Sequence, residues 1–547
     1  MLFVFAVALF GSHAQSQVSL VVAEDAKVTA SDAATGQSFG QSVALDGDRV
    51  IVGTFAGGGA YVYVLGGNGW TEEQKLGSSA TVLPDQLGWS VAIDGDTAVV
   101  GAPAGATLYW EEGAAFVYTR NGTTWTEQAQ LTAADAESGD LFGFSVAVSG
   151  DTVVVGASND DDAGSNSGSA YVFVRNGTTW TQEAKLTAAD ADVSDFFGVS
   201  AAIESDTILV GASLDNWGGL FHGGSAYVFT RSGTAWTQEA KLTASDAGVG
   251  DDFGWSVSLS GDTALVSGHL GNDPEPDSGS AYVFTRSGTI WTEQAKLRVP
   301  ALVAGDHLGF SVSVDGDIAV LGAIHAHVGG EEQGAAYVFT RNGNAWFEQA
   351  RLAPGDIGAF DGFGRTVAVD GRRIAVGATG DEQSTGAAFF YSLLDPSYCF
   401  CSAAAPCANE DPDAGCTNST GDGAHLLAGG TTSLSADDLL LTVSGVPRNQ
   451  FGLLFMGGAQ RLVPFGGGQR CIGAGFGALC RFPVQSSGAT GVLTEGPGIV
   501  AFSGTQAMSC HIDPGETWHF QAWFRDPAGP CGAFFNLSNA ASISFGP

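Results

Sequence analysis

Apolar and polar residues alternate along most of this chain in short runs that return at a nearly constant spacing. Four runs in one stretch each have the length of a single strand: Ser145–Val148, Thr152–Gly156, Ala170–Val174 and Trp180–Leu186. Ser149-Gly150 stands between the first two and Asn176-Gly177 between the last two, and such pairs favour tight turns. The pattern therefore predicts an antiparallel sheet of four consecutive strands.

The four predicted strands differ in how their apolar residues are placed. The second and third are apolar at consecutive positions, which indicates a sheet that is buried on both faces. The fourth alternates: Trp180, Ala184 and Leu186 are expected on one face, and the polar residues between them on the other. The fourth strand is therefore expected at the half-exposed outer edge.

This unit is repeated, and a Phe-Gly or Leu-Gly pair opens each copy. The seven pairs begin at Phe39, Leu87, Phe142, Phe197, Phe253, Leu308 and Phe363, at intervals of 48 to 56 residues. Four strands in about 55 residues are typical of a propeller blade. The sequence predicts a seven-bladed β-propeller over residues 18–397.

The ends of the repeat region complement one another. The outer-strand tryptophan occurs six times for seven blades, at Trp70, Trp125, Trp180, Trp236, Trp291 and Trp346. The seventh blade therefore lacks an outer strand, while residues 26–32 match the outer-strand segment 184–190 without a blade of their own. We expect this N-terminal strand to complete the seventh blade and close the ring, which removes exposed strand edges.

A second domain is expected at residues 398–547, where the repeat stops. All eight cysteines lie there, at Cys399, Cys401, Cys407, Cys416, Cys471, Cys480, Cys510 and Cys531. Short apolar runs between turn signals predict a small β-sandwich-like fold, so the whole chain is expected to be all-β. Cys471 and Cys480 could staple a hairpin, the other pairings stay open, and zinc binding by the first four cysteines is a weaker alternative.

The first 14 residues resemble a secretory signal peptide. An apolar run up to Phe10 precedes Ser12-His13-Ala14, which suits cleavage, although no Lys or Arg precedes the run. The run is too short for a stable membrane span. The expected location is secreted, extracellular or on the cell surface, where disulfides persist.

The charge of the chain limits its partners. It has 58 acidic and 21 basic residues, a formal net charge of −37, which repels nucleic-acid phosphates and anionic lipids. We expect no nucleic-acid partner and no membrane span. Acidity on this scale serves solubility more often than ligand binding.

The repeat resembles the FG-GAP family, whose propellers are also found in integrin α-subunit headpieces. The second half of that motif appears as Gly101-Ala102-Pro103 and Gly156-Ala157-Ser158, and is degraded at Ser267-Gly268-His269. In the family, several repeats carry a calcium loop between the first two strands. Here that turn is as short as Asp94-Gly95-Asp96, so no cofactor is firmly implied, and Ca²⁺ on the acidic loops stays open. The segments at 449–455 and 523–527 resemble a C-terminal module of exported planctomycete-type bacterial proteins, which implies location only.

Candidate binding residues lie in the long loops, which emerge from one face of a four-stranded propeller while the tight turns emerge from the other. They are Tyr109, Trp110, Asp160, Asp161, Asp162, Trp217 and Phe221. Aromatics beside carboxylates can stack on sugars or anchor a protein. The alternative is that the aromatics fold back as small local cores.

No catalytic pattern stands out. The nine histidines lack a recurring partner, and no nucleophile elbow, His-Glu-x-x-His or phosphate loop occurs. The sequence therefore favours a non-enzymatic binding or adhesion scaffold that recognises a protein or a glycan. A polysaccharide hydrolase or lyase, and a structural component of the cell envelope, remain as alternatives.

Overall fold

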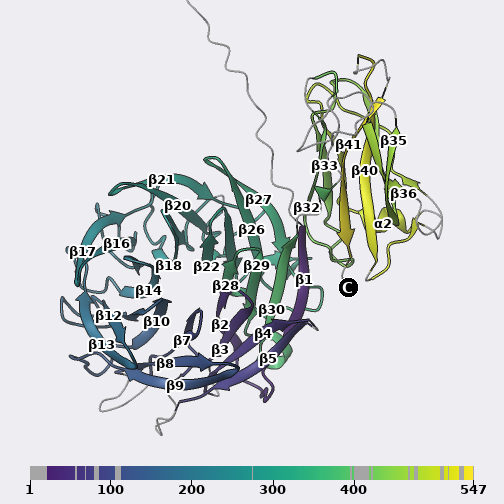
Figure 1. Cartoon of the computed structure of the whole chain (residues 1–547). Helices are drawn as coiled ribbons and strands as arrows, with labels where there is room; N and C mark the ends of the chain where they lie inside the picture. The colour runs from purple at the N-terminus through teal and green to yellow at the C-terminus, as the bar shows by residue number, and fades with distance from the viewer. Residues whose placement is uncertain are drawn as a thin grey trace, which may run out of the picture.

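The propeller predicted from the repeats is present in the computed structural model. The model describes residues 21–55, 58–67, 69–78, 86–104, 112–273, 275–394, 397–398, 418–420, 423–465, 468–473, 479–505, 510–514, 516–528 and 535–545. Seven four-stranded antiparallel sheets surround one axis (Figure 1). The predicted signal peptide and the four cysteines of the zinc alternative lie outside the described residues.

Six blades consist of strands in chain order. The first contains β2 (Phe39–Asp46), β3 (Arg49–Thr54), β4 (Ala60–Gly66) and β5 (Gly69–Leu76); the second β6 (Ser90–Asp94), β7 (Thr97–Ala102), β8 (Ala114–Asn121) and β9 (Thr124–Leu131); the third β10 (Phe142–Ser149), β11 (Thr152–Ala157), β12 (Ser169–Asn176) and β13 (Thr179–Leu186). The fourth contains β14 (Phe197–Glu204), β15 (Thr207–Ala212), β16 (Ser225–Ser232) and β17 (Ala235–Leu242); the fifth β18 (Phe253–Ser260), β19 (Thr263–Gly268), β20 (Ser280–Ser287) and β21 (Ile290–Leu297); the sixth β22 (Leu308–Asp315), β23 (Ile318–Ala323), β26 (Ala335–Asn342) and β27 (Ala345–Leu352).

The seventh blade joins the two ends of the ring. It contains β28 (Phe363–Asp370), β29 (Arg373–Ala378), β30 (Ala387–Leu394) and, as its outer strand, β1 (Val21–Val28). β1 pairs antiparallel with β30, from Val21 opposite Leu394 to Val28 opposite Ala388. The expected closure by the N-terminal strand is confirmed. Two short elements decorate the loops: the hairpin β24 (His327–Val328) and β25 (Glu331–Glu332), and helix α1 (Asp381–Ser384).

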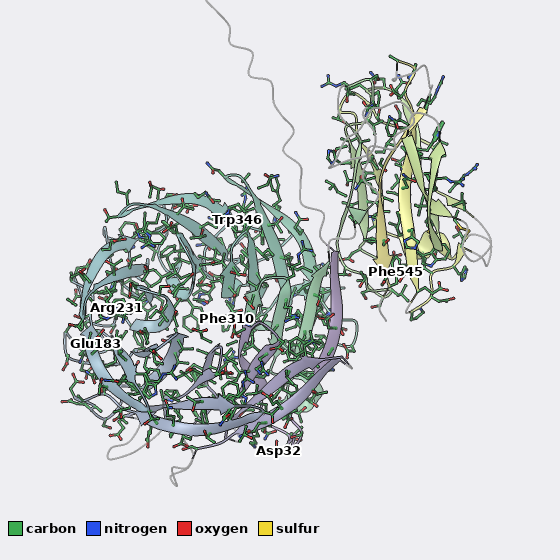
Figure 2. All side chains as sticks on the ribbon, in the orientation of Figure 1. Asp32, Glu183, Arg231, Phe310, Trp346 and Phe545 are labelled. Atoms are coloured by element: carbon green, nitrogen blue, oxygen red, sulfur yellow. A yellow bond between two sulfur atoms is a disulfide. The ribbon has the colours of Figure 1, made fainter. Side chains whose placement is uncertain are left out.

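Burial follows the predicted order of strands. Every residue of β7, β11, β15 and β19 is buried, whereas β13, β17 and β21 each expose two of their first three residues. First strands of neighbouring blades contact one another at the centre. Figure 2 places Phe310 near the axis and Glu183 and Arg231 at the outer rim.

The outer strands do not alternate as simply as the sequence suggests. In β13, Gln182 lies opposite Phe173 and Ala184 opposite Val172, so Glu183 is an extra residue in a β-bulge. The bulge turns Trp180 towards the second blade, while Ala184 and Leu186 pack towards the fourth. The expectation that all three share one face is therefore wrong.

The C-terminal domain is a sandwich of two main sheets. One contains β31 (Ser397–Tyr398), β41 (Phe535–Ser544), β40 (Thr517–Arg525), β34 (Phe451–Gly457), β37 (Cys480–Arg481) and β38 (Gln485–Ser486); the other contains β32 (His425–Gly429), β33 (Leu440–Ser444) and β39 (Leu493–Glu495). β35 (Ala459–Phe465) pairs with β36 (Gly468–Gly473), and helix α2 spans Ile499–Ser503. Leu441 and Val443 of the smaller sheet share a core with Trp518 and Phe520 of the larger.

One disulfide is described in this domain, between Cys480 and Cys510. The suggested pairing of Cys471 with Cys480 is wrong. The bond instead joins β37 to the segment that follows α2, and both cysteines are buried in the sandwich core.

The strand that closes the ring also ties the two domains together. The N–H of Val22 donates to the carbonyl of Gly430 at 3.2 Å, and the N–H of Thr432 donates to the carbonyl of Val22 at 3.1 Å. The N–H of Gly430 also donates to the carbonyl of Gln349, on the outer strand of the sixth blade, at 3.1 Å. The C-terminal domain therefore rests on the junction of the sixth and seventh blades.

We predict that deleting residues 18–32 opens the ring. The deletion leaves the N–H and C=O groups of β30 unpaired and exposes Phe389 and Tyr391, so the thermal midpoint should fall by roughly 10 °C or more. Calorimetry of the full chain and the deletion variant measures this. A synthetic peptide of residues 21–32 added to the variant should restore part of the midpoint; an unchanged midpoint without peptide would contradict the closure.

Candidate functional site

The two faces of the propeller differ in the length of their connections. The turns between first and second strands, and between third and fourth strands, are tight and carry glycines with positive φ such as Gly150 and Gly177. The opposite face carries the loops between second and third strands and the loops between blades. We call it the loop face and the other the turn face. Figure 1 shows the propeller along its axis.

Asp160 and Asp162, which were predicted to bind a ligand, already have hydrogen-bond and ion-pair partners within the third blade. The hydroxyl of Tyr171 donates to Asp160 at 2.6 Å, and the Lys185 ammonium lies 2.9 Å from the same carboxylate. Lys185 also pairs with Asp135 at 2.8 Å and with Asp162, and its Nζ is 5.1 Å from the centroid of the Tyr171 ring. Asp160 is only 3% exposed. These two carboxylates therefore hold the blade together.

The pKa of Lys185 reflects its contacts with three aspartates. Desolvation alone lowers the pKa of Lys185, but its hydrogen bonds to Asp135, Asp160 and Asp162 outweigh desolvation and raise the pKa. Asp161 differs because it is exposed, and its carboxylate accepts only the loop N–H of Asn166 at 2.6 Å. Of the three aspartates, Asp161 alone faces solvent without a cation beside it in the described part of the loop.

The same tyrosine–lysine–aspartate network recurs in other blades. The hydroxyl of Tyr227 donates to Asp190 at 3.0 Å and to Asp215 at 3.1 Å, and Lys241 pairs with both aspartates. Equivalent sets are Tyr282, Lys296 and Asp246 in the fifth blade, and Tyr61, Lys75 and Asp32 in the first. The network is a repeated structural device, and its sequence signal is a lysine 14 residues after the tyrosine in all four blades, with an aspartate four residues after the preceding outer strand.

The predicted aromatic residues have different surroundings. The indole N–H of Trp217 donates to the carbonyl of Gly224 at 2.9 Å, and Trp217 forms a bridge with Leu220, so it stabilises its own loop. Phe221 is 62% exposed and stacks on His222 with 3.7 Å between ring centroids. Tyr109 and Trp110 lie outside the described residues.

Four of the exposed apolar side chains on the loop face were not found from the sequence. Besides Phe221, one large apolar residue stands exposed in each of four successive loops between blades: Val193 at 52%, Val249 at 62%, Val303 at 45% and Phe360 at 75%. Phe221 and Val249 occupy adjoining loops, since the N–H of Gly250 donates to the carbonyl of Phe221 at 3.0 Å. The only sequence signal is one apolar residue shortly before the aspartate that ends each loop.

Asp140 and Asp195, which end two of the loops between blades, are buried, and Asp252 is half-buried. Desolvation raises the pKa of Asp140 and of Asp195 from 3.8 to about 6, and that of Asp252 to about 7. Hydrogen bonds from Glu137 N–H to Asp140 and from Asp192 N–H to Asp195 oppose the rise. These carboxylates hold the loops in place, but their desolvated charges lower the stability of the native state near neutral pH.

The structure brings together histidines that are scattered in the sequence. The ring centroids of His269 and His307 are 5.8 Å apart, and those of His307 and His325 are 5.0 Å apart. Desolvation lowers the pKa of His269 to about 3, so this histidine is neutral. Among the described residues, no three His, Cys, Asp or Glu side chains gather in a way that could hold a metal.

The comparison with known families agrees with this geometry. The model of the FG-GAP repeat matches residues 22–64, 70–118, 125–173, 180–229, 236–284, 291–339 and 346–391, so each match joins an outer strand to the three inner strands of the next blade. The chain belongs to the FG-GAP repeat family. No curated protein matches the sequence of this FG-GAP propeller.

A solved structure titled "Crystal Structure of Mitotic Checkpoint Complex" contains a chain with 12% identity and a TM-score of 0.42, covering 72% of this chain and 99% of that one. A similarity this low carries no argument about function. Within the part of the chain that the structure describes, no helix is long and apolar enough to span a bilayer.

We predict that Asp160→Asn destabilises the propeller by about 1–3 kcal/mol, because it weakens the acceptor for Tyr171 and removes a buried partner of Lys185. Asp161→Asn is the matched control: it should change little, since the amide oxygen can still accept from Asn166. Urea denaturation at pH 7 measures both. Equal effects of the two substitutions would contradict the structural role of Asp160.

We predict a pH dependence from Asp140 and Asp195. Their native pKa values lie above the unfolded values, so the native state binds more protons between about pH 4 and pH 6, and their contribution to stability is lost as the pH rises through this window. Asp140→Asn with Asp195→Asn should therefore raise the free energy of unfolding at pH 7, by up to about 3 kcal/mol per site, and hardly at pH 4. Urea denaturation at both pH values tests this, and a gain that is the same at both would contradict it.

Proposed function

We propose that this FG-GAP propeller is an exported, non-enzymatic binding scaffold that engages a protein partner through its loop face. Support for binding comes from the exposed Phe221, Val193, Val249, Val303 and Phe360, which project from successive loops of a closed ring. Large apolar side chains spaced among polar groups act as anchors at protein interfaces. Support for export comes from the disulfide, because such bonds persist in oxidising compartments.

The rigidity of the scaffold favours recognition. The loops are held by buried aspartates, by the tyrosine–lysine–aspartate networks and by hydrogen bonds between adjoining loops, such as Gly305 N–H to the carbonyl of Pro276 at 3.0 Å. Loops that are ordered before binding lose less conformational entropy when a partner docks. The acidic groups around the apolar anchors favour a partner surface with basic residues.

We predict that Phe221→Ser with Val249→Ser weakens partner binding at least tenfold, because both anchors lie in adjoining loops and each contributes about 1 kcal/mol or more. The measurement is an array of purified extracellular and cell-surface proteins, followed by interferometry of the proteins that bind. A glycan array printed beside it shows whether the loop face recognises a sugar instead.

Ile290→Ser is the matched control. Ile290 is 66% exposed, begins β21 and lies on the turn face, so Ile290→Ser removes an exposed apolar side chain without touching the loops. The proposal is wrong if both variants bind like the unchanged chain, or if glycans bind the loop face and proteins do not.

A further inference from the structure

The sixth blade has lost the tyrosine–lysine–aspartate network that the first, third, fourth and fifth blades contain. Tyr337 lies opposite Arg351 in the sheet, as Tyr171 lies opposite Lys185 in the third blade. Four residues after the end of the preceding outer strand, the third blade has Asp135 and the sixth has Ala301.

The second carboxylate of the network is missing as well. In the third blade the carbonyl of Asp160 accepts the N–H of Gly168, and in the sixth the carbonyl of Ala326 accepts the N–H of Gly334, so Ala326 stands where Asp160 does. The sixth blade therefore keeps a tyrosine and a cation but has alanine in place of both acids. Tyr337 is 4% exposed, and its hydroxyl has no hydrogen-bond partner among the described residues.

A proline removes a further internal contact. In the third blade the side chain of Gln182 accepts the N–H of Ala134 at 3.0 Å, and in the fifth Glu293 accepts the N–H of Ser245 at 2.9 Å. The equivalent of Gln182 in the sixth blade is Glu348, opposite Phe339 in the sheet, and the equivalent loop position is Pro300. Proline has no N–H, so Glu348 loses the donor that its counterparts use.

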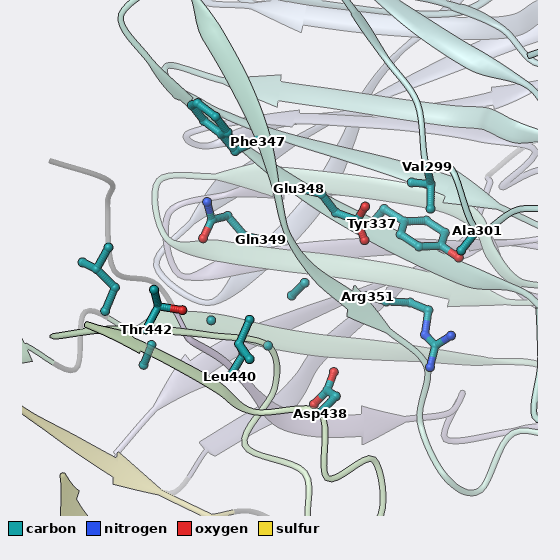
Figure 3. Close-up of a pocket in the computed structure, with 15 residues that line it drawn as sticks. Val299, Ala301, Tyr337, Phe347, Glu348, Gln349, Arg351, Asp438, Leu440 and Thr442 are labelled. Carbon is teal, nitrogen blue, oxygen red and sulfur yellow. The ribbon is translucent and has the colours of Figure 1, made fainter. Parts of the chain in front are cut away.

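These freed groups line a cleft of about 530 Å³ between the sixth blade and the C-terminal domain. In Figure 3, Tyr337, Glu348 and Arg351 project from the propeller, and Asp438 and Leu440 lie on the opposite wall. The nearby backbone contact between Gly430 and Gln349 fixes the distance between the two walls.

The chemistry of the cleft fits a neutral, hydroxyl-rich ligand. Glu348 and Asp438 offer acceptors, the Arg351 guanidinium offers donors, and the Tyr337 hydroxyl can do both. Phe347 and Leu440 are each 38% exposed at the cleft and provide apolar contact. An anion would face two carboxylates against one guanidinium, so phosphate and sulfate groups are disfavoured.

The surroundings of Glu348 agree with a partly enclosed site. The side chain keeps an exposed surface in the cleft, yet desolvation by the cleft walls raises the pKa of its carboxyl group, and only Arg351 acts to lower it. A polar group held in this way gains from a ligand that supplies a hydrogen-bond donor.

We propose that the cleft between the sixth blade and the C-terminal domain binds a neutral saccharide, with Tyr337, Glu348, Arg351 and Asp438 bonding its hydroxyl groups and Phe347 packing against a sugar ring. This site contains none of the exposed loop-face residues Val193, Phe221, Val249, Val303 and Phe360, and it uses residues that the sequence did not single out. Its binding does not depend on the partner of the loop face.

The test uses the full chain on a printed array of neutral oligosaccharides, with affinities of bound sugars measured by calorimetry. Tyr337→Phe removes only the unpaired hydroxyl and should weaken binding at least fivefold without lowering the thermal midpoint. Tyr282→Phe, the same substitution in the intact network of the fifth blade, should lower the thermal midpoint and leave sugar binding unchanged.

A second variant rebuilds the lost network. Ala301→Asp with Arg351→Lys gives Tyr337 an acceptor and a paired lysine, as in the fifth blade, and should abolish sugar binding while the thermal midpoint stays equal or rises. Phe221→Ser with Val249→Ser should bind sugar like the unchanged chain, which separates this site from the loop face.

Three results would overturn the proposal. They are no bound neutral oligosaccharide at millimolar concentration, binding that survives both Tyr337→Phe and the rebuilt network, and preference for a lysine-rich peptide over every sugar in the same calorimetric assay. The last would assign the cleft to a basic protein segment.

Discussion

The ring depends on a close backbone approach between neighbouring blades at its centre, which paired glycines permit at six of the seven junctions. Gly156, at the end of β11, has no room for a side chain, because a Cβ there would overlap the carbonyl of Gly198 in the next blade. Gly198 itself has φ +91°, and its carbonyl accepts the Ser145 hydroxyl at 2.8 Å. The same pairs occur at Gly53 and Gly88, Gly101 and Gly143, Gly211 and Gly254, Gly322 and Gly364, and Gly377 and Gly40. The Phe-Gly and Gly-Ala halves of the repeat are thus the two sides of one contact.

This central contact explains why large side chains lie between the blades at the periphery of the ring. Sheets that nearly touch at the axis diverge outwards, so larger side chains are needed at the periphery. The outer-strand tryptophans supply this volume, and those of the second to sixth blades bond back to the preceding blade: the Trp180 indole N–H donates to Gln128 at 2.8 Å, and that of Trp236 to Glu183 at 3.1 Å. The bulge makes the second contact possible, because Glu183 is the extra residue.

The features that could be predicted from the sequence are those that recur in successive repeats. Seven Phe-Gly or Leu-Gly pairs and six tryptophans were enough to predict both the blades and the closing strand. The bulge at Glu183 was missed because one inserted residue changes the faces of a strand without changing its composition. Asp160 was predicted to bind a ligand because it lies in a loop with two further aspartates. Lys185, which pairs with Asp160, is brought close to it only by the pairing of β12 with β13.

The sixth blade shows how internal repeats can identify a site that no single motif reveals. Ala301, Ala326 and Pro300 form no motif by themselves. They indicate a site only when they are compared with the aspartates and the backbone N–H group at the equivalent positions of the third blade. Three internal contacts of the other blades are absent at this place, so Tyr337 and Glu348 line the cleft instead of bonding a partner inside the blade. These contacts are absent in the blade that the C-terminal domain covers, and that domain forms the second wall of the cleft. A structural explanation would require the domain to supply the missing acceptors, but Asp438, on that wall, already accepts from Thr431 at 2.6 Å and forms no described bond to Tyr337.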